Sequence, residues 1–358
     1  MAKIVTVTGE IEAEQLGFTS MHEHVLAYLV PFFKKQAAPE FYTSLPIAAD
    51  EKITMDKLAY LNELGLRSYC ADNWDLLDKE LMLKEVEWFK QRGGNSILEV
   101  SAPGIRGDAN GMRDISRQSG VNIIASTGLY VKVSWPEKFN TMSPKAYQAY
   151  LLDEIENGID GTDIRAGHIK TAIRSEAEDE LKFMEKSAEV AGEKNMLLTA
   201  HASRGVAVTA RRKLVRRLLE TGMPPEKLLL CRIHFSFWQG DFVDALLQPD
   251  SCQLQLDWAR EVLDMGVNVC VDCFGEQPGV WNSIRLAGLI KLLNAGYEDQ
   301  IVIGNDVYQK TMTRACGNFG YCGIIDYVIP ELLRHGISKD VIDKITVKNA
   351  VKMLQCGK

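Results

Sequence analysis

One pattern occurs four times between residues 196 and 306: MLLTAH (196–201), LLLCRIH (228–234), VNVCVDCF (267–274) and QIVIGND (300–306). Each run is short, apolar and rich in branched side chains, which is typical of buried β-strands. The segments between them, such as VTARRKLVRRLLETG (208–222), have the apolar spacing of amphipathic helices, and several end in the glycine that often closes a helix. Strands that alternate with helices predict a parallel sheet.

Four similar runs come earlier in the chain: FTSMHEH (18–24), NSILEV (95–100), VNIIAST (121–127) and AGHIK (166–170). Eight strand–helix units predict an α/β protein with a closed (β/α)8 barrel, the TIM barrel. The alternative is an open, doubly wound sheet. No G-x-G-x-x-G sequence follows the first strand, so the dinucleotide-binding version of that sheet has no support.

Two regions fall outside the eight units. VTVTGEIEAEQLG (5–17) predicts a short N-terminal hairpin that turns near Thr8-Gly9. Residues 25–94 are far longer than a usual connection between a strand and a helix, and they contain helical patterns. We therefore expect a helical insertion after strand one, over the top of the barrel. No linker rich in Pro, Gly or Ser interrupts the chain, so residues 1–358 are expected to form a single barrel domain.

The composition is that of an ordinary globular protein. Hydrophobic residues make up 46% of the 358 residues and charged residues 25%, while 41 basic and 48 acidic residues give a net charge of −7. This acidic balance argues against a nucleic-acid partner and is compatible with a small-molecule substrate. No apolar run reaches the roughly 18–20 residues of a membrane-spanning helix, and the N-terminus lacks a signal-peptide pattern. We therefore expect no membrane association and a cytoplasmic location.

The cysteines do not indicate a disulfide scaffold, because there are only eight of them in the chain. Cys270 and Cys273 form a C-x-x-C sequence inside a predicted strand. Positions i and i+3 of a strand point to opposite faces, so the two thiols cannot easily hold one ion. A structural place in the core is favoured for both.

Side chains of the types found in metal sites stand at the carboxyl ends of five predicted strands, where barrel enzymes carry their active sites. They are His22 and His24, Lys170, His201, His234 and Asp306. A single histidine at a strand end is more often a hydrogen-bonded structural residue than a ligand. Four of the six histidines fall at such ends, which favours a common site. His22 and His24 are two residues apart on a strand, so both imidazoles can face one ion.

These motifs resemble a known family. HEH ending strand one, a lysine ending strand four, histidines on strands five and six and an aspartate ending strand eight are similar to the amidohydrolase superfamily. The resemblance narrows to its phosphotriesterase-like family, and within it to lactonases of phosphorylated sugar lactones. It rests on GFTSMHEHV (17–25), STGLY (126–130), RAGHIK (165–170), LLTAHAS (197–203), IGND (303–306) and ITVKNAVKML (345–354). It covers nearly the whole chain.

The resemblance implies a binuclear metal centre. His22, His24 and Asp306 would bind the more buried ion, and His201 and His234 would bind the more exposed one. Zinc suits imidazole and carboxylate ligands best, with manganese, cobalt or iron as alternatives.

The resemblance also implies how this centre works. Lys170 would bridge the ions after its amine adds CO2, because a free ammonium has no lone pair for a metal. A metal-bridging hydroxide would attack the substrate, and Asp306 would take its proton and pass it to the leaving group. Tyr130 matches a position that lies over the metals and contacts substrate in lactonase-like relatives; an aromatic of the pocket wall is the alternative.

Two strand ends depart from the family pattern. Strand six reads CRIHFSFWQGD (231–241), with Arg232 before His234, where relatives often carry a motif of the Gly-His-x-Asp type. We expect this change to alter the pocket wall beside the more exposed metal. At strand two, Ser101 and Ala102 stand where relatives often carry an acidic residue.

Basic residues near the predicted site are candidates for binding an anion. Lys310 and Arg314 follow strand eight, in the region where barrel enzymes often hold a phosphate. Lys132 follows the STGLY motif. Solvated surface is the alternative for these three side chains.

The leading hypothesis from the sequence is a metal-dependent hydrolase of ester bonds that opens a phosphorylated sugar lactone, an aldono-1,4-lactone phosphate. An alternative keeps the metals but takes an apolar lactone, such as an acyl-homoserine lactone, or a phosphotriester. The apolar pocket that such a substrate needs could be formed by Trp135, Phe235, Phe237, Trp238 and Trp281. A remote alternative is a non-catalytic protein that binds metal or a sugar phosphate. The resemblance also suggests a homodimer.

Overall fold

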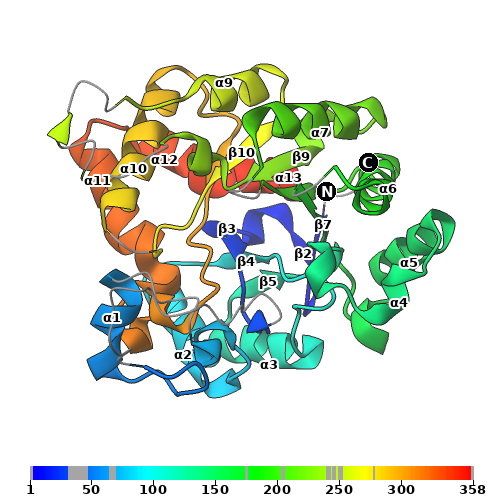
Figure 1. The fold of residues 1–358 in the computed structure, drawn as a ribbon, viewed down its shortest axis with the longest axis horizontal. Helices are drawn as coiled ribbons and strands as arrows, with labels where there is room; N and C mark the ends of the chain where they lie inside the picture. Colours follow the sequence, from blue (N-terminus) through cyan, green and yellow to red (C-terminus); the bar gives the residue numbers. More distant parts are fainter. Residues whose placement is uncertain are drawn as a thin grey trace.

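The structure of the chain is a computed structural model, shown as a ribbon in Figure 1. It describes residues 3–30, 47–63, 70–173, 176–202, 206–238, 243, 247–248, 253–276 and 279–355.

Parallel strands form the centre of the described structure, and helices surround them (Figure 1). In chain order the strands are β3 (Thr19–Glu23), β4 (Ser96–Glu99), β5 (Asn122–Ile124), β6 (Ser126–Gly128), β7 (His168–Ile173), β8 (Leu198–Ala202), β9 (Leu228–Cys231), β10 (Asn268–Val271) and β11 (Ile301–Ile303). β3 to β5 form one sheet and β6 to β11 a second, with each strand paired to its neighbour along the chain. Only Ala125 separates β5 from β6. The backbone N–H of Asp306 donates to the carbonyl oxygen of His22 at 2.8 Å, which connects the last strand to the first. The expected (β/α)8 barrel is confirmed.

The strands separate two apolar clusters, because alternate side chains of a strand point to opposite faces. On β10, Val269 and Val271 pack in the large cluster that includes the surrounding helices, whereas Cys270 packs in a smaller one. β11 repeats this division, with Val302 in the smaller cluster. Leu16, just before β3, closes on the same smaller cluster. Both faces of these strands are therefore buried, which explains their continuous apolar sequences.

The helices follow the predicted apolar spacing. Those after the insertion are α3 (Ala109–Ser119), α4 (Glu137–Asn140), α5 (Pro144–Glu156), α6 (Glu178–Glu193), α7 (Val208–Glu220), α9 (Asp257–Asp264), α10 (Gly279–Asn294), α11 (Ile329–Arg334), α12 (Lys339–Asp343) and α13 (Asn349–Leu354). α3 shows the local signals that set its ends. The side chain of Asp108 accepts a hydrogen bond from the N–H of Asn110 at its start, and Gly120 ends it with a φ of 68°.

The N-terminal hairpin is present but shorter than the sequence predicts. β1 (Lys3–Thr6) pairs antiparallel with β2 (Gly9–Glu12), and Gly9 has a φ of 117° at the turn. Residues Ala13–Gln15 form a 3-10 turn instead of continuing the hairpin.

The insertion after β3 contains the expected helices. These are α1 (Leu58–Glu63) and α2 (Lys79–Gln91), and α2 begins where Asp78 accepts from two backbone N–H groups. Other parts of the predicted insertion, residues 31–46 and 64–69, lie outside the described residues. Leu29 and Trp74 line a cavity together with side chains at the barrel's strand ends. The insertion therefore contributes to the wall over that end of the barrel.

Strand six differs from the prediction. β9 stops at Cys231, Arg232 adopts the left-handed region with a φ of 59°, and Ile233–Ser236 form a 3-10 helix. His234 therefore lies on a helical turn and not at the end of a strand.

None of the described helices is both long and apolar enough to cross a membrane.

Candidate metal centre

A cavity of about 190 Å³ lies where the strands end and the insertion covers them. The residues that line it include several at or directly after the end of a strand, such as His24, Val100 and Arg232. The lining residues are His22, His24, Leu29, Trp74, Val100, Ile105, Tyr130, Lys170, His201, Arg232 and Tyr308. The cavity thus combines titratable groups with several apolar side chains, which is the usual make-up of a small-molecule site.

His22, His24 and Asp306 form the clearest group of metal-ligand side chains. Oδ1 of Asp306 lies 3.6 Å from Nε2 of His22 and 3.4 Å from Nε2 of His24. Ligand atoms about 2.1 Å from a tetrahedral ion stand about 3.4 Å apart, so these separations fit one divalent ion. Among the described residues Oδ1 of Asp306 has no hydrogen-bond partner, although the side chain is fully buried. A cation would satisfy this oxygen, and these three residues therefore fit a metal.

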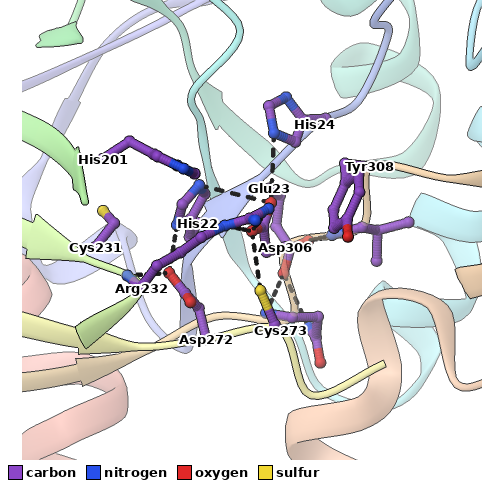
Figure 2. A network of polar contacts seen from close by, with 12 residues as sticks. His22, Glu23, His24, His201, Cys231, Arg232, Asp272, Cys273, Asp306 and Tyr308 are labelled. Carbon is purple, nitrogen blue, oxygen red and sulfur yellow. Dashed lines mark hydrogen bonds and ion pairs between the residues drawn. The ribbon is translucent and has the colours of Figure 1, made fainter. Parts of the chain in front are cut away.

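Neighbouring side chains orient the two imidazoles. Nδ1 of His22 lies 2.5 Å from Oδ2 of Asp272, and Nδ1 of His24 lies 2.8 Å from Oγ of Ser101. These contacts leave Nε2 of each ring for the ion, as is usual for histidine ligands. Figure 2 shows His22 and His24, from one segment at the end of β3, together with Asp306.

The electrostatics of the trio favour a cation. Burial lowers the pKa of His22, but the negative charge of Asp306 and other buried anions outweighs it and raises the pKa to about 10. Burial is also the main reason that the pKa of His24 falls to about 4. The anions around His22 thus favour a positive charge at this place, while His24 remains a neutral electron-pair donor.

Glu23, the middle residue of the HEH motif, positions Asp306 by binding the backbone on both sides of it. Its buried carboxylate accepts hydrogen bonds from the N–H groups of Asn305 at 2.8 Å and Val307 at 2.9 Å, one on each side of Asp306. Asp306 has a φ of 52°, in the region that most side chains avoid. Glu23 therefore helps to hold a strained backbone at the site.

Lys170 lies on β7 and lines the same cavity. The residue is 1% exposed, and within the described structure its Nζ atom has no hydrogen-bond partner. An ammonium group without a partner is unfavourable in such a place.

His201 and Tyr130 meet at the cavity. The hydroxyl of Tyr130 lies 3.1 Å from Nε2 of His201, and the two rings pack edge to face with centroids 5.0 Å apart. Burial, followed by the charge of Arg232, holds the pKa of His201 well below its usual value of 6.5. His201 is therefore a neutral imidazole beside a tyrosine hydroxyl.

The structure does not bring His234 to this cavity. Nδ1 of His234 lies 3.2 Å from Oδ1 of Asp272, and its ring packs on Phe235 with centroids 4.5 Å apart. The reason is the early end of β9, which leaves Arg232 and not His234 among the lining side chains.

Arg232 forms a buried ion pair with Asp306. Its Nε and Nη2 atoms lie 2.7 Å and 2.5 Å from Oδ2 of Asp306. The guanidinium carbon also lies 4.8 Å from the ring centroid of Tyr308, within cation–π distance. The sequence analysis expected Arg232 to alter the pocket wall beside the more exposed metal, but it did not predict the ion pair with Asp306.

The predicted anion-binding residues are not among the lining side chains. Lys310 pairs with Asp72 at 2.7 Å. Lys132 pairs with Asp179 on the surface. Arg314 lies 3.5 Å from Asp326, with its guanidinium carbon 5.1 Å from the ring centroid of Trp88.

Asp272 is the residue that the sequence reasoning missed. It follows the end of β10 and is fully buried, and it contacts both His22 and His234. An acidic residue just after an apolar strand is the signal that could have identified it. Cys270 and Cys273, which flank it, are buried free thiols.

A (β/α)8 barrel with a histidine–aspartate cluster at its carboxyl end defines a class of hydrolases that use a divalent metal. A profile of the phosphotriesterase family matches residues 2–223 and 246–354. The chain therefore belongs to the phosphotriesterase family, a family of binuclear metal hydrolases.

Individual relatives agree with this assignment. An N-acetyltaurine hydrolase from Tetraodon nigroviridis is 30% identical over 359 residues, which cover 98% of this chain and 97% of that protein. A resiniferatoxin-binding protein from Rhodobacter sphaeroides has a similar structure, with a TM-score of 0.85 at 23% identity over 99% of this chain and 95% of that one. A lactonase from Listeria monocytogenes has a TM-score of 0.74 at 21% identity and is covered over 100% of both chains. The two solved structures support the fold, and the named hydrolases agree with an enzyme that cleaves ester or amide bonds.

Proposed function

We propose that this protein hydrolyses the amide bond of a small N-acyl substrate with a short acyl chain. The observation that carries this proposal is the cavity of only about 190 Å³, which His22 and His24 of the trio line together with apolar side chains. A short acyl group suits the apolar part of so small a space. The relative named N-acetyltaurine hydrolase, 30% identical along nearly the whole chain, supports an amide over an ester.

The trio would hold one divalent ion, with zinc as the first choice for two imidazoles and a carboxylate. When bound, such an ion supplies a Lewis acid and lowers the pKa of water. Asp272 and Ser101 keep the imidazoles in the binding orientation. Asp306 offers Oδ1 to the ion while Oδ2 remains bound to Arg232.

Tyr130 is placed to donate a hydrogen bond to the reacting group. Its hydroxyl reaches the cavity beside the neutral ring of His201, whose Nε2 lies 3.1 Å away and can accept its hydrogen bond. Leaving amines need a proton more than leaving alkoxides do, so this pair suits an amide substrate.

We further propose that Lys170 carries a carbamate in the active enzyme. Addition of CO2 to the neutral amine forms an N–C bond, and the N–H proton that is lost leaves with water. The product has two oxygens that can bind a metal, which removes the unpaired buried amine. The test is ¹³C NMR of holoenzyme prepared in ¹³C-bicarbonate, with Lys170→Arg as the control that cannot form the adduct.

The phosphorylated sugar lactone that the sequence predicts finds less support. Lys310, Arg314 and Lys132 lie in ion pairs outside the set of cavity-lining residues. Such a substrate would have to place its phosphate against Arg232, because a carbamate on Lys170 would be negatively charged.

The experiment compares kcat/KM of zinc-loaded enzyme across matched substrates. The panel contains N-acetyltaurine, N-acetylglycine, a five-carbon aldonolactone with and without its terminal phosphate, an acyl-homoserine lactone and a phosphotriester. We expect the N-acetyl amides to give the highest values, and Asp306→Asn to abolish them while the far-UV circular dichroism is kept. A clear preference for the phosphorylated lactone would overturn the amide proposal in favour of the sugar-lactone alternative. No turnover of any member would count against the amide as well.

A further inference from the structure

Arg232 occupies the side of the site where the resemblance places the second metal ion. It follows β9, lines the cavity, and has a side chain that is 14% exposed. Aromatic rings flank its guanidinium, with centroids of Tyr308 at 4.8 Å and Phe235 at 5.4 Å from the guanidinium carbon. The group is therefore held in place by packing as well as by its ion pair. Figure 2 shows the side chain reaching toward Asp306.

Asp306 divides its two oxygens between two partners. Oδ1 faces the imidazoles of His22 and His24 at 3.6 Å and 3.4 Å. Oδ2 faces two nitrogen atoms of Arg232 and the thiol of Cys273, whose Sγ lies 3.2 Å away. A carboxylate oxygen has two lone-pair positions, so these contacts fill Oδ2. One side of Asp306 fits a metal ion, and the other side is already bound to a cation.

The predicted ligands of a second ion are not assembled. His201 lines the cavity, but His234 turns to Asp272 and Phe235. Among the described residues, the groups with three ligand atoms close together are His22–His24–Asp306, His22–Cys270–Asp272 and His234–Asp272–Cys273, and none of them contains His201. The His, Cys, Asp and Glu side chains present therefore do not assemble three ligands for a second ion beside His201, and a Lys170 carbamate would add only one further ligand group there.

A guanidinium is the wrong neighbour for such an ion. It keeps its positive charge at any pH that a protein survives, and it has no lone pair to offer a metal. A divalent ion placed beside it would be repelled in a site that excludes most water. The same properties make it a fixed electrostatic partner for an oxygen that becomes negative during hydrolysis.

We propose that the Arg232 guanidinium takes the place of the second metal, so that this chain binds one divalent ion, at His22, His24 and Asp306. The contacts with Asp306 use two of the five N–H donors of the guanidinium, and the group borders the cavity. Its other donors are then available to form hydrogen bonds with the substrate oxygen that an exposed metal ion would bind in a binuclear centre. This inference rests on the proposed metal centre but not on the identity of the substrate.

Metal stoichiometry tests the proposal without any substrate. Purified enzyme is saturated with Zn²⁺, freed of excess ion on a desalting column, and analysed by inductively coupled plasma mass spectrometry. We expect one zinc per chain in the wild type and in Arg232→Lys, which keeps a cation. We expect two zincs per chain in Arg232→His, because an imidazole there offers a lone pair next to His201. Arg212→His, on α7 and paired with Glu261, is the matched control and should stay at one.

The outcomes separate this inference from the proposed function. Two zincs per wild-type chain, at any pair of sites, would overturn the inference and leave a metal-dependent hydrolase. One zinc in a folded Arg232→His variant would also overturn it, since the guanidinium would then not be what excludes the second ion. No zinc in the wild type would instead overturn the metal centre itself. Because Arg232→His can fail to fold, electron paramagnetic resonance of Mn²⁺-loaded wild type gives a second readout. The inference requires an isolated Mn²⁺ spectrum, and an exchange-coupled pair would refute it.

Discussion

The carboxylate of Asp272 accepts a hydrogen bond from Nδ1 of His22 at 2.5 Å, and both side chains are buried. The same carboxylate accepts from the backbone N–H of Arg232 at 3.1 Å. Its other oxygen lies 3.2 Å from Nδ1 of His234. Asp272 thus connects the end of β10 with the first metal ligand and with the segment after β9. It fixes the orientation of His22 and also the place where the chain leaves strand six.

Replacing Asp272 with Asn should weaken metal binding. Asn has only one acceptor oxygen and a weaker dipole, so His22 loses its oriented, negatively charged partner. Losses of this kind lower metal affinity by about 10–100-fold. Competition with a chromophoric zinc chelator would measure the change, and Asp264→Asn, on the surface at the end of α9, is the control. Unchanged zinc affinity in a folded Asp272→Asn variant would show that the contact with His22 does not tune the metal ligand.

Replacing Tyr130 with Phe should reduce turnover more than it reduces stability. The variant keeps the ring that packs on His201 and loses only the hydroxyl 3.1 Å from Nε2. One such hydrogen bond contributes about 1 kcal/mol to folding, whereas a positioned donor contributes about 100-fold to kcat. Steady-state kinetics on the preferred substrate would show kcat falling with little change in KM. Tyr297→Phe, whose hydroxyl donates to Asp264 on the surface, is the matched control. Equal kinetics for the two variants would make Tyr130 a wall aromatic, as the sequence also allowed.

The sequence predicted the strands well because their burial on both faces leaves a plain apolar signal. β8, for example, spans Leu198–Ala202 within one residue of the end of the predicted MLLTAH run. Strand-end histidines were also informative, since the carboxyl ends of parallel strands meet at one edge and bring His22, His24 and His201 to one cavity.

The sequence could not predict where strand six ends. The run LLLCRI (228–233) reads as a strand up to Ile233, but the chain turns at Arg232, which has a φ of 59°. That turn is set by tertiary contacts, in which Asp272 accepts from the N–H of Arg232 and Asp306 binds the guanidinium. Both partners are distant in sequence, so the periodicity of strand six cannot reveal these contacts. Because of this turn, Arg232 lines the cavity and His234 does not.

Replacing Glu99 with Gln should reduce the pH dependence of stability. Burial raises the pKa of Glu99 to about 7, although hydrogen bonds from Ser101 oppose the rise. The folded state therefore holds a proton that the unfolded chain releases near its ordinary pKa of about 4.5. The resulting stabilisation is present below that value and is lost as the pH rises through about 7, a difference on the order of 3 kcal/mol.

Urea unfolding at pH 5, 6, 7 and 8 measures this effect. Gln imitates the protonated acid and keeps an acceptor for the N–H of Ser101, so the fall in the free energy of unfolding between pH 5 and 8 should become shallower. Glu193→Gln, exposed at the end of α6, should leave the slope unchanged. A Glu99→Gln variant with the wild-type slope would mean that Glu99 is ionised throughout this range in the folded protein.

Replacing Gly128 with Ala should disrupt the register between β6 and β7 at the site. Gly128 pairs with Lys170 and has a φ of 108°, and a Cβ atom there would lie 2.1 Å from the carbonyl oxygen of Lys170. Neither that backbone atom nor the strand can move away without shifting Lys170 out of the cavity. A positive φ alone costs an alanine about 1–2 kcal/mol, and we expect the added clash to raise the loss in unfolding free energy above about 3 kcal/mol.

Gly222→Ala separates the two effects, since Gly222 has a φ of 89° with no atom within 4 Å of its Cβ position. Chemical denaturation should show a small loss for Gly222→Ala and a large one for Gly128→Ala. Equal losses would mean that the barrel relaxes around residue 128 and that the close approach of the two strands does not hold Lys170 in place.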